Sequence, residues 1–274
     1  DLSLQLKPYS NFDYNNKLDT SGYNRQHVSK GIFSPKLNLY FTPNESLQFF
    51  LLSGKSFHSN DTRVVVAQNG KEILPAAYGA EIGAHFKPLD KMFMSASLWG
   101  LYLQQEFVYV GDEAVVEASG ASQRVGIDLG IRYDINDWLY ADADFNYAMP
   151  RALGVANGEN KIPLAPTVTS IGGLTIKTPI GIKTSFRYRY LGDRPANEDF
   201  SSIAKGYTLF DGIIEYSIKK TSFSLSAENI FNVKWNEAQF ETESRMKGEQ
   251  TSVSEIHYTA GTPLFLKAKM VYNF

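Results

Sequence analysis

The chain has 274 residues, no Cys, 27 Lys and Arg against 29 Asp and Glu, and a formal net charge of −2. This charge gives no general electrostatic case for nucleic-acid binding, and the lack of Cys excludes disulfides, thiolate metal sites and thiol catalysis. No uninterrupted apolar run is longer than four residues, whereas a membrane-spanning helix needs about 20, so helical membrane proteins are excluded.

Apolar and polar residues instead alternate along the chain with a period of two. In residues 181–190, GIKTSFRYRY, every second position is apolar or small, and the intervening positions carry Lys, Ser and Arg. The same alternation runs through 124–133, 139–147 and 264–274. Because a strand sends successive side chains to opposite faces, the pattern predicts strands with one apolar and one polar face.

The coarse pattern predicts about twelve strands and no amphipathic helix. Residues 47–52 and 168–176 carry apolar or small side chains at both parities, so their outward faces stay open. In chain order the predicted strands are 2–13, 30–43, 45–58, 75–88, 91–110, 120–134, 137–149, 165–178, 180–192, 205–219, 221–232 and 259–274.

The connections between these strands alternate strictly between short and long. Every second connection is a minimal turn of Pro, Asn, Asp or charged residues, whereas the others are long and polar, as at 233–258. All short turns therefore lie at one end and all long loops at the other, which is typical of outer-membrane barrels and has no reason to occur in a soluble sandwich.

Three further features favour a membrane barrel over a half-buried soluble sheet. The alternating runs that give a strand its apolar face extend over nine or more residues. The opposite face carries charged residues in mid-strand, which a dry core would not hold unpaired. Aromatic residues gather near the ends of the apolar faces, as in interfacial girdles. The prediction is one all-β domain over residues 1–274, an antiparallel transmembrane β-barrel with short periplasmic turns and long extracellular loops. The aromatic residues are Phe41, Phe86, Tyr133 and Trp138 by the short turns, and Phe145, Tyr147, Tyr188 and Tyr190 toward the long loops.

Several segments also resemble TonB-dependent outer-membrane receptors, in family order, over about residues 30 to 274. The stretches YRYLGDR at 188–194, GYTLFD at 206–211 and LSAENIFN at 225–232 are similar to the late barrel of that family. So is GTP at 261–263, which enters a last strand ending in Phe274. Earlier segments that resemble the family are 34–37, 54–57 and 78–83.

The resemblance implies a 22-stranded barrel with an N-terminal plug, a TonB-box and a signal peptide. This chain has room for about twelve strands and shows no plug-like segment, so we expect the C-terminal part of such a receptor barrel. An even strand number would permit closure into a smaller barrel, whereas an open sheet with two free edges is not expected in lipid.

The resemblance implies binding and transport rather than catalysis. We expect no cofactor, no metal site and no catalytic residue. It implies a multi-pass protein of the outer membrane of a Gram-negative bacterium, taking up a scarce nutrient such as a ferric siderophore with energy from the TonB complex. The implied partners are outer-membrane lipid, the plug with the N-terminal strands, and the nutrient chelate.

Candidate site residues fall into three groups. The last long loop would contact ligand, although its many Glu residues suit an anionic siderophore poorly. Charged residues on the polar faces of the strands would face the lumen, where they would bridge strands and bind water. The last strand would carry the barrel-assembly signal. These are Trp235, Phe240, Arg245 and His257 for ligand; Lys183, Arg187, Arg189, Lys267, Lys269, Asp128, Asp142 and Asp144 for the lumen; and Met270, Tyr272 and Phe274 for assembly.

Two alternatives remain open. A complete twelve-stranded porin or autotransporter-type translocator explains the strand number but not the receptor motifs. An outer-membrane phospholipase has about this length and needs Ser and His together on the outer wall, whereas His85 falls on the polar parity. The sequence has no nucleophile elbow, P-loop, dinucleotide fingerprint or metal-ligand spacing of His.

Overall fold

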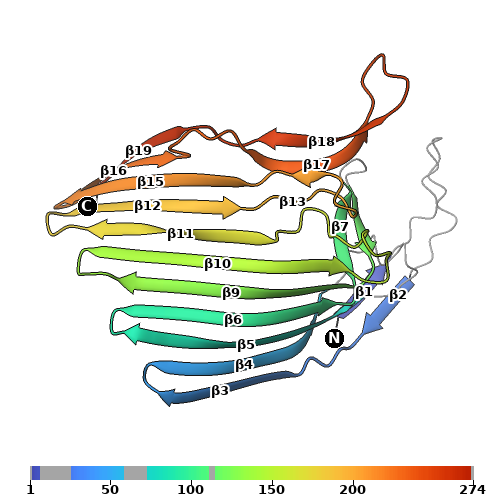
Figure 1. The fold of residues 1–274 in the computed structure, drawn as a ribbon, viewed down its shortest axis with the longest axis horizontal. Helices are drawn as coiled ribbons and strands as arrows, with labels where there is room; N and C mark the ends of the chain where they lie inside the picture. Colours follow the sequence, from blue (N-terminus) through green and yellow to red (C-terminus); the bar gives the residue numbers. More distant parts are fainter. Residues whose placement is uncertain (1, 7–25, 59–72, 111–114, 273–274) are drawn as a thin grey trace.

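The computed structural model describes residues 2–6, 26–58, 73–110 and 115–272. Within these ranges eleven antiparallel strands form one large curved sheet, in which each strand pairs with the next strand of that sheet along the chain (Figure 1). Within the described ranges no helix is long and apolar enough to cross a membrane. The sheet contains β3 (Lys36–Asn44), β4 (Leu47–Phe57), β5 (Ala76–Leu89), β6 (Met92–Leu103), β9 (Ser122–Asp134), β10 (Leu139–Ala152), β11 (Val168–Lys177), β12 (Ile182–Leu191), β15 (Tyr207–Ile218), β16 (Thr221–Glu228) and β19 (Phe265–Tyr272).

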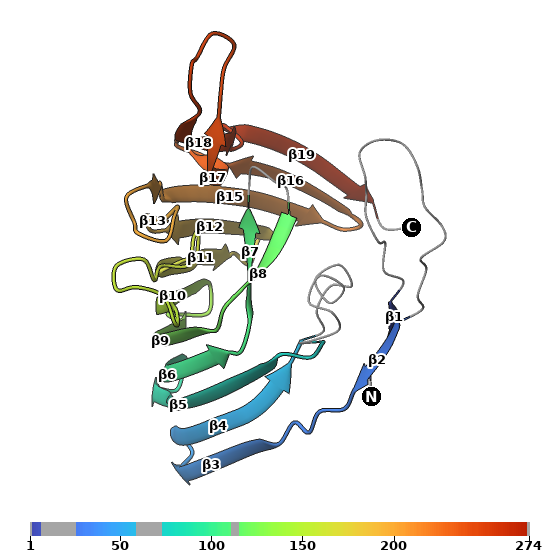
Figure 2. The same ribbon diagram turned by 90° about the vertical axis from the view of Figure 1, so that its right-hand side faces the viewer.

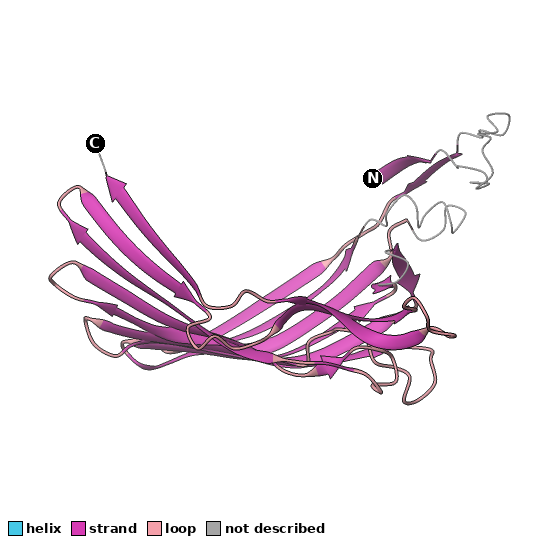
Figure 3. Cartoon of the chain, turned by 90° about the horizontal axis from the view of Figure 1, so that it is seen from above, coloured by secondary structure: helices cyan, strands magenta, loops and turns pink. Residues whose placement is uncertain are grey.

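The sheet is a curved wall that does not close on itself, with β3 and β19 as its edges (Figures 2 and 3). The all-β antiparallel architecture is confirmed, whereas the closure into a smaller barrel that an even strand number would permit does not occur in this structure. An odd number of alternating strands makes β3 and β19 run in the same direction, so pairing them would place a parallel seam in an antiparallel sheet.

The first predicted strand, 2–13, is shorter and lies elsewhere. β1 (Leu2–Leu6) pairs with β2 (Gln26–Lys30) in a separate two-stranded sheet, and residues 7–13 lie outside the described residues. The strand predicted over 30–43 begins only at Lys36, because residues 31–35 interrupt it. The other ten predicted strands correspond to the rest of the main sheet, with shifted ends.

The predicted alternation of connections is confirmed. The five turns between β3 and β4, β5 and β6, β9 and β10, β11 and β12, and β15 and β16 are short and lie at one end. We call the other end, where the long connections gather, the rim.

The long connections hold structure that the sequence pattern did not predict. They contain the pairs β7 (Glu106–Val110) with β8 (Val115–Ser119), β13 (Arg194–Pro195) with β14 (Ile203–Ala204), and β17 (Asn236–Ser244) with β18 (Val253–Ala260). The strand predicted over 91–110 breaks at Gln104, where the side-chain oxygen accepts the Ala76 N–H at 3.0 Å and the Gln104 N–H donates to the Ala76 carbonyl at 2.9 Å.

The strand register sorts the side chains onto two faces. Leu98, Ile127 and Tyr147 lie in one row on an apolar face, whereas Asp128 and Asn146 lie in a row on a polar face. On the polar face side chains crowd together and several are buried, including Phe50, Ser97 and Leu209, as expected on the concave side of a curved sheet. We call this polar face the inner wall.

The register also settles the two ambiguous segments. In β4, Phe49 and Leu51 share the apolar face with Ile82, whereas Phe50 and Leu52 lie on the inner wall. In β11, Leu174 pairs with Ala141 and Phe186 on the apolar face.

Candidate functional site

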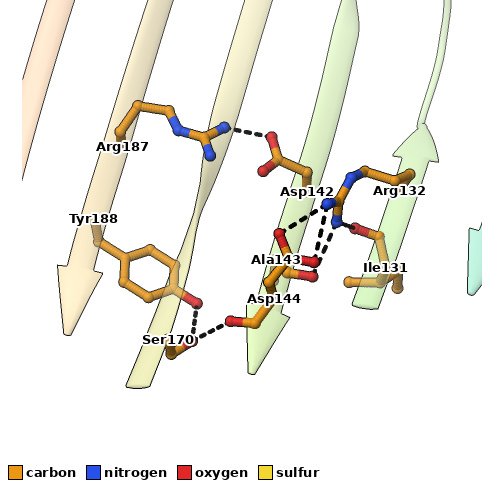
Figure 4. A network of polar contacts seen from close by, with 8 residues as sticks. All are labelled: Ile131, Arg132, Asp142, Ala143, Asp144, Ser170, Arg187 and Tyr188. Atoms are coloured by element: carbon orange, nitrogen blue, oxygen red, sulfur yellow. Dashed lines mark hydrogen bonds and ion pairs between the residues drawn. The ribbon is translucent and has the colours of Figure 1, made fainter. Parts of the chain in front are cut away.

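The inner wall carries a row of charge that crosses three strands. Asp142 of β10, Gly173 of β11 and Arg187 of β12 stand opposite one another, and Arg187 donates a hydrogen bond to the Asp142 carboxylate across the glycine (Figure 4). A Cβ atom at Gly173 would lie 2.2 Å from the Phe186 carbonyl oxygen and 2.9 Å from Cδ of Arg187. The glycine therefore leaves the space in which the arginine lies flat over β11 and buries Asp142, whose side chain is 7% exposed.

A second arginine ties β9 to β10. Arg132 Nη2 donates to both carboxylate oxygens of Asp144, at 2.9 and 2.7 Å, and its Nη1 donates to the carbonyls of Ile131 and Ala143 (Figure 4). The carboxylate and the two backbone carbonyls together hold the guanidinium against the neighbouring strand. Since both side chains are about 40% exposed, water screens the attraction, and the pair contributes more to register than to stability.

The remaining lumen candidates also lie on the inner wall. Arg189 Nε donates to Asp211 at 3.1 Å, and Asp128 accepts a hydrogen bond from Asn146. Lys183 stands opposite Glu215 in register. Lys267 and Lys269 lie on the edge strand β19, beside Ser226 and Ser224. The structure thus ties four predicted lumen residues, Arg187, Arg189, Asp142 and Asp144, into ion pairs between strands.

The part of the inner wall nearer β3 is rich in aromatic side chains. The Phe50 ring lies over Gly83 and the Trp99 ring lies over Gly126, because neither glycine has a Cβ to block it. The His85 ring stands 5.0 Å from the Phe50 ring and 5.4 Å from the Phe93 ring, between centroids. His85 therefore lies on the inner wall, away from the apolar face.

A shallow hollow of about 500 Å³ adjoins this aromatic region. It lies over β3 to β6, and its lining combines apolar side chains such as Leu52, Leu101 and Trp99 with the charged side chains of Lys36 and Glu81. Within the described ranges, no three His, Asp or Glu side chains come close enough together to hold a metal ion.

The four predicted ligand residues do not form one cluster. Trp235 lies at the base of the β17–β18 hairpin, where its N–H donates to the Thr262 carbonyl at 3.0 Å and its ring stands 4.7 Å from the Tyr207 ring. The ring also fills the space beside Gly261, where a Cβ would lie 2.1 Å from it. Trp235 thus anchors the hairpin.

The other three ligand candidates lie farther out on the hairpin. Phe240 and His257 are cross-strand partners, and His257 Nε2 lies 3.2 Å from Oε1 of Glu255 and 3.3 Å from Oγ of Ser244. Arg245 directly follows the end of β17 and is exposed. The structure therefore brings Phe240 and His257 together and leaves Trp235 apart from them.

Two amides that the sequence analysis missed hold the hairpin to the rim. Asn229, 2% exposed, donates to the carbonyls of Val233 and Thr262 and accepts the Val233 N–H at 2.9 Å. Gln239, also 2% exposed, bonds both the backbone N–H and the carbonyl of Lys205. The signal for Asn229 was its place in the motif LSAENIFN, whereas Gln239 has no local signal.

The assembly-signal residues stand on the last strand. Met270 and Tyr272 project from the apolar face and are 66% and 52% exposed, whereas Phe274 lies outside the described residues.

Comparison with known families decides the assignment. A family model described as TonB dependent receptor-like, beta-barrel matches residues 1–233. The chain belongs to the TonB-dependent receptor family. The members of this family are receptors and transporters of the Gram-negative outer membrane, and the family is not one of enzymes. A search of curated proteins gives no match.

Solved structures of TonB-dependent receptors share the fold. The siderophore receptor PiuA from Acinetobacter baumannii has a TM-score of 0.62 at 15% identity, over 86% of this chain and 35% of its own. The ferric citrate transporter FecA has a TM-score of 0.71 at 14% identity, over 92% and 40%. The ferric-catecholate import receptor Fiu from E. coli K12 has a TM-score of 0.68 at 13% identity, over 99% and 40%. The TonB-dependent receptor chain thus spans well under half the length of these structures.

Proposed function

We propose that this chain forms part of the wall and rim of a receptor that takes up a scarce metal chelate across the outer membrane with energy from TonB. The observation that carries the proposal is the family match over residues 1–233. The names of the structural neighbours, which include siderophore, ferric citrate and ferric-catecholate receptors, support a metal chelate as the nutrient class.

The geometry supports a division of labour between inner wall and rim. The acidic and basic side chains of the inner wall pair with each other between strands, so they stabilise the wall rather than bind a ligand. In the proposed receptor the inner wall faces the plug, and the apolar face contacts lipid. On the rim hairpin His257 and Arg245 are exposed and Phe240 is half-buried. These three remain the proposed ligand contacts, with Trp235 as their anchor.

The porin, autotransporter-type and phospholipase alternatives find less support. A porin or translocator explains neither the family match nor the structural neighbours. A phospholipase needs its histidine on the outer wall, and His85 lies on the inner wall between two phenylalanine rings.

Growth on defined metal sources tests the proposal. A Gram-negative host without its own iron receptors would receive the intact gene that encodes the chain, with and without a working TonB, and grow on ferric citrate, catecholate or hydroxamate siderophores, haem or copper chelates. We expect growth on one class only, and only with TonB. Growth on every small solute without TonB would instead support a porin, and growth on none of the chelates would contradict the proposal.

A matched pair of rim variants locates the contact. His257→Ala should weaken chelate uptake, whereas Lys220→Ala in a short turn at the opposite end should not. Equal uptake by both variants would remove His257 from the proposed contacts.

A further inference from the structure

The apolar face of the wall carries charge at two positions, and both charges are positive. Among the residues that the register places on this face of the eleven described strands, only Lys55 of β4 and Arg151 of β10 are charged. The acids that the register places in these strands, such as Asp142 and Glu215, all lie on the inner wall. The apolar face therefore has an excess of positive charge.

Both cations belong to one row of residues that crosses five strands at the rim end of the apolar face. Each member of the row stands opposite the next one in the register. Since neighbouring strands lie about 4.8 Å apart, the four intervals from β4 to β10 separate the two cations by about 19 Å. We call this set the cation row, and from β4 to β10 its members are Lys55, Tyr78, Tyr102, Gln123 and Arg151.

Within the described residues, neither cation of the row forms an ion pair with an acid. The Lys55 ammonium lies 5.7 Å from the centroid of the Tyr78 ring, and that ring lies 6.1 Å from the Tyr102 ring. Arg151 Nη1 donates to the carbonyl of its neighbour Pro150 at 2.9 Å. A tyrosine ring and a carbonyl oxygen orient the two cations but leave their charge in place.

The cation row stands at the end of a band of exposed apolar side chains. Ile82 and Leu98 are cross-strand partners on the same face, and each is 57% exposed. Ile82 follows Tyr78 by four residues, which places it about 13 Å nearer the short turns. Tyr, Lys and Arg are typical of the level where hydrocarbon gives way to lipid headgroups, because their apolar parts stay in the hydrocarbon and their polar ends reach out of it.

We propose that the cation row binds anionic phosphate groups of lipids in the membrane leaflet at the rim. A guanidinium matches phosphate oxygens with parallel N–H groups, and an ammonium attracts them as a point charge. The distance between the two cations exceeds the size of one phosphate, so the row offers two separate contacts. A second copy of the chain fits this surface less well, since a row in contact with itself would place cation against cation.

The proposal rests on one part of the proposed function, the placement of the apolar face against lipid. It goes beyond that function because it names the headgroup chemistry and the two residues that recognise it. It needs no particular nutrient and no energy from TonB.

Fluorescence quenching beside the row tests the proposal. The receptor encoded by the intact gene would carry a fluorophore on Val125→Cys, because Val125 lies on the same face and is 45% exposed. It would be reconstituted in phosphatidylcholine vesicles that contain a small share of nitroxide-labelled phosphatidic acid or, separately, of nitroxide-labelled phosphatidylcholine. Phosphatidylcholine carries a cationic choline beside its phosphate, whereas phosphatidic acid does not, so the two quenchers differ in net headgroup charge.

The variants for this measurement are Lys55→Gln, Arg151→Gln, the double variant, Lys55→Arg and Lys36→Gln. Lys36→Gln is the matched control, since Lys36 lies opposite Gly54 at the same end of the sheet but on the inner wall. It removes the same charge from the other face. Lys55→Arg keeps the positive charge of the row.

We expect phosphatidic acid to be favoured beside the label in the wild type, by about fivefold for each cation that contacts a phosphate. Each single Gln variant should lower this preference about fivefold, and the double variant should abolish it. Lys55→Arg and Lys36→Gln should keep it, and 1 M salt should weaken it in the wild type. Equal quenching by the two lipids in the wild type, or an unchanged preference in the double variant, would overturn the proposal. An equal loss in Lys36→Gln would do the same.

The failure of the cation row is separable from failure of the proposed function. TonB-dependent growth together with equal quenching by the two lipids would overturn the cation row alone. A preference that depends on Lys55 and Arg151, without uptake of any chelate, would overturn the function and keep the row. If a Gln variant does not insert, the wild-type preference, its loss in salt and Lys55→Arg still decide.

Discussion

At the scale of single residues, the inner wall is organised by glycines that stand where a neighbouring large side chain crosses a strand. Phe50 lies over Gly83, Trp99 over Gly126, and Arg187 beside Gly173. A glycine in a strand weakens it through chain entropy, and here the close approach of another side chain offsets that cost. The most consequential case is Gly173, because the arginine it admits neutralises the buried Asp142.

Gly173→Ala tests this role. The added methyl group would lie 2.2 Å from a backbone oxygen that cannot move away alone, so we expect a loss of about 1–3 kcal/mol in the free energy of unfolding. Gly79→Ala is the matched control, since its nearest neighbours are 3.9 Å from the new methyl group and its effect should stay within about 0.5 kcal/mol. Urea unfolding of both variants in lipid vesicles measures the difference, and equal losses would contradict the interpretation.

Single residues also show where prediction from sequence stops. Parity placed Asp142, Arg187 and Arg189 on one face correctly, because a strand's period of two is local information. Their pairing across strands was not predictable, since it depends on register between segments far apart in the chain. The sequence did not predict the anchoring role of Trp235 or the burial of Arg194 for the same reason, because both arise from packing at the rim between distant segments.

At the scale of elements, each strand of the wall is defined by its two unlike faces. In β16, Leu225 projects from the apolar face and is 53% exposed, whereas the adjacent Ser224 lies on the inner wall opposite Glu215. An apolar residue that stays this exposed is unfavourable in water and is favourable against lipid hydrocarbon. The same contrast holds along β9, where Ile127 faces outward and Asp128 faces inward.

Arginine at these two adjacent positions tests the assignment of faces. Leu225→Arg should cost about 2–4 kcal/mol near the bilayer midplane and sharply lower the amount of folded protein in the outer membrane. Ser224→Arg adds the same charge on the inner wall, where it stands opposite Glu215, and should insert normally. Quantifying both variants in outer-membrane fractions checks the prediction, and the reverse order of insertion would show that the faces are assigned the wrong way round.

Element boundaries were the least predictable feature at this scale. The sequence pattern located the main-sheet strands because each presents a long alternating run. It merged β6 with β7, although the polar residues Gln104, Gln105 and Glu106 interrupt the alternation between them. At the end of β6 the Gln104 side chain accepts the N–H of Ala76, 28 residues away in the chain, and no local pattern contains this contact. The hairpin β17–β18 was taken for a loop because its strands are rich in Glu, Ser and Thr rather than apolar residues.

At the scale of the whole molecule, the strand count governs what the sheet can do. Eleven antiparallel strands leave β3 and β19 running in the same direction, each with one row of main-chain groups facing no strand of the sheet. Unpaired edges are unfavourable in lipid, so the sheet requires further strands to complete a barrel, and their number must be odd if every seam is antiparallel. That requirement agrees with structural neighbours in which this chain accounts for 35–40% of the length.

Engineered cysteine pairs test the open sheet directly, since the chain has no Cys of its own. Ser224→Cys with Lys269→Cys joins two residues that stand opposite each other in β16 and β19, where antiparallel Cα atoms lie close enough for a disulfide. This pair should oxidise completely within one chain. Asn38→Cys with Lys269→Cys joins inner-wall positions on the two edge strands, and it should form no disulfide within one chain because the edges do not meet. Non-reducing gels of the protein, oxidised in the outer membrane of cells that carry the intact gene, separate the two results. An intramolecular disulfide in the edge pair would mean that the wall closes on itself in the membrane and that further strands are not required.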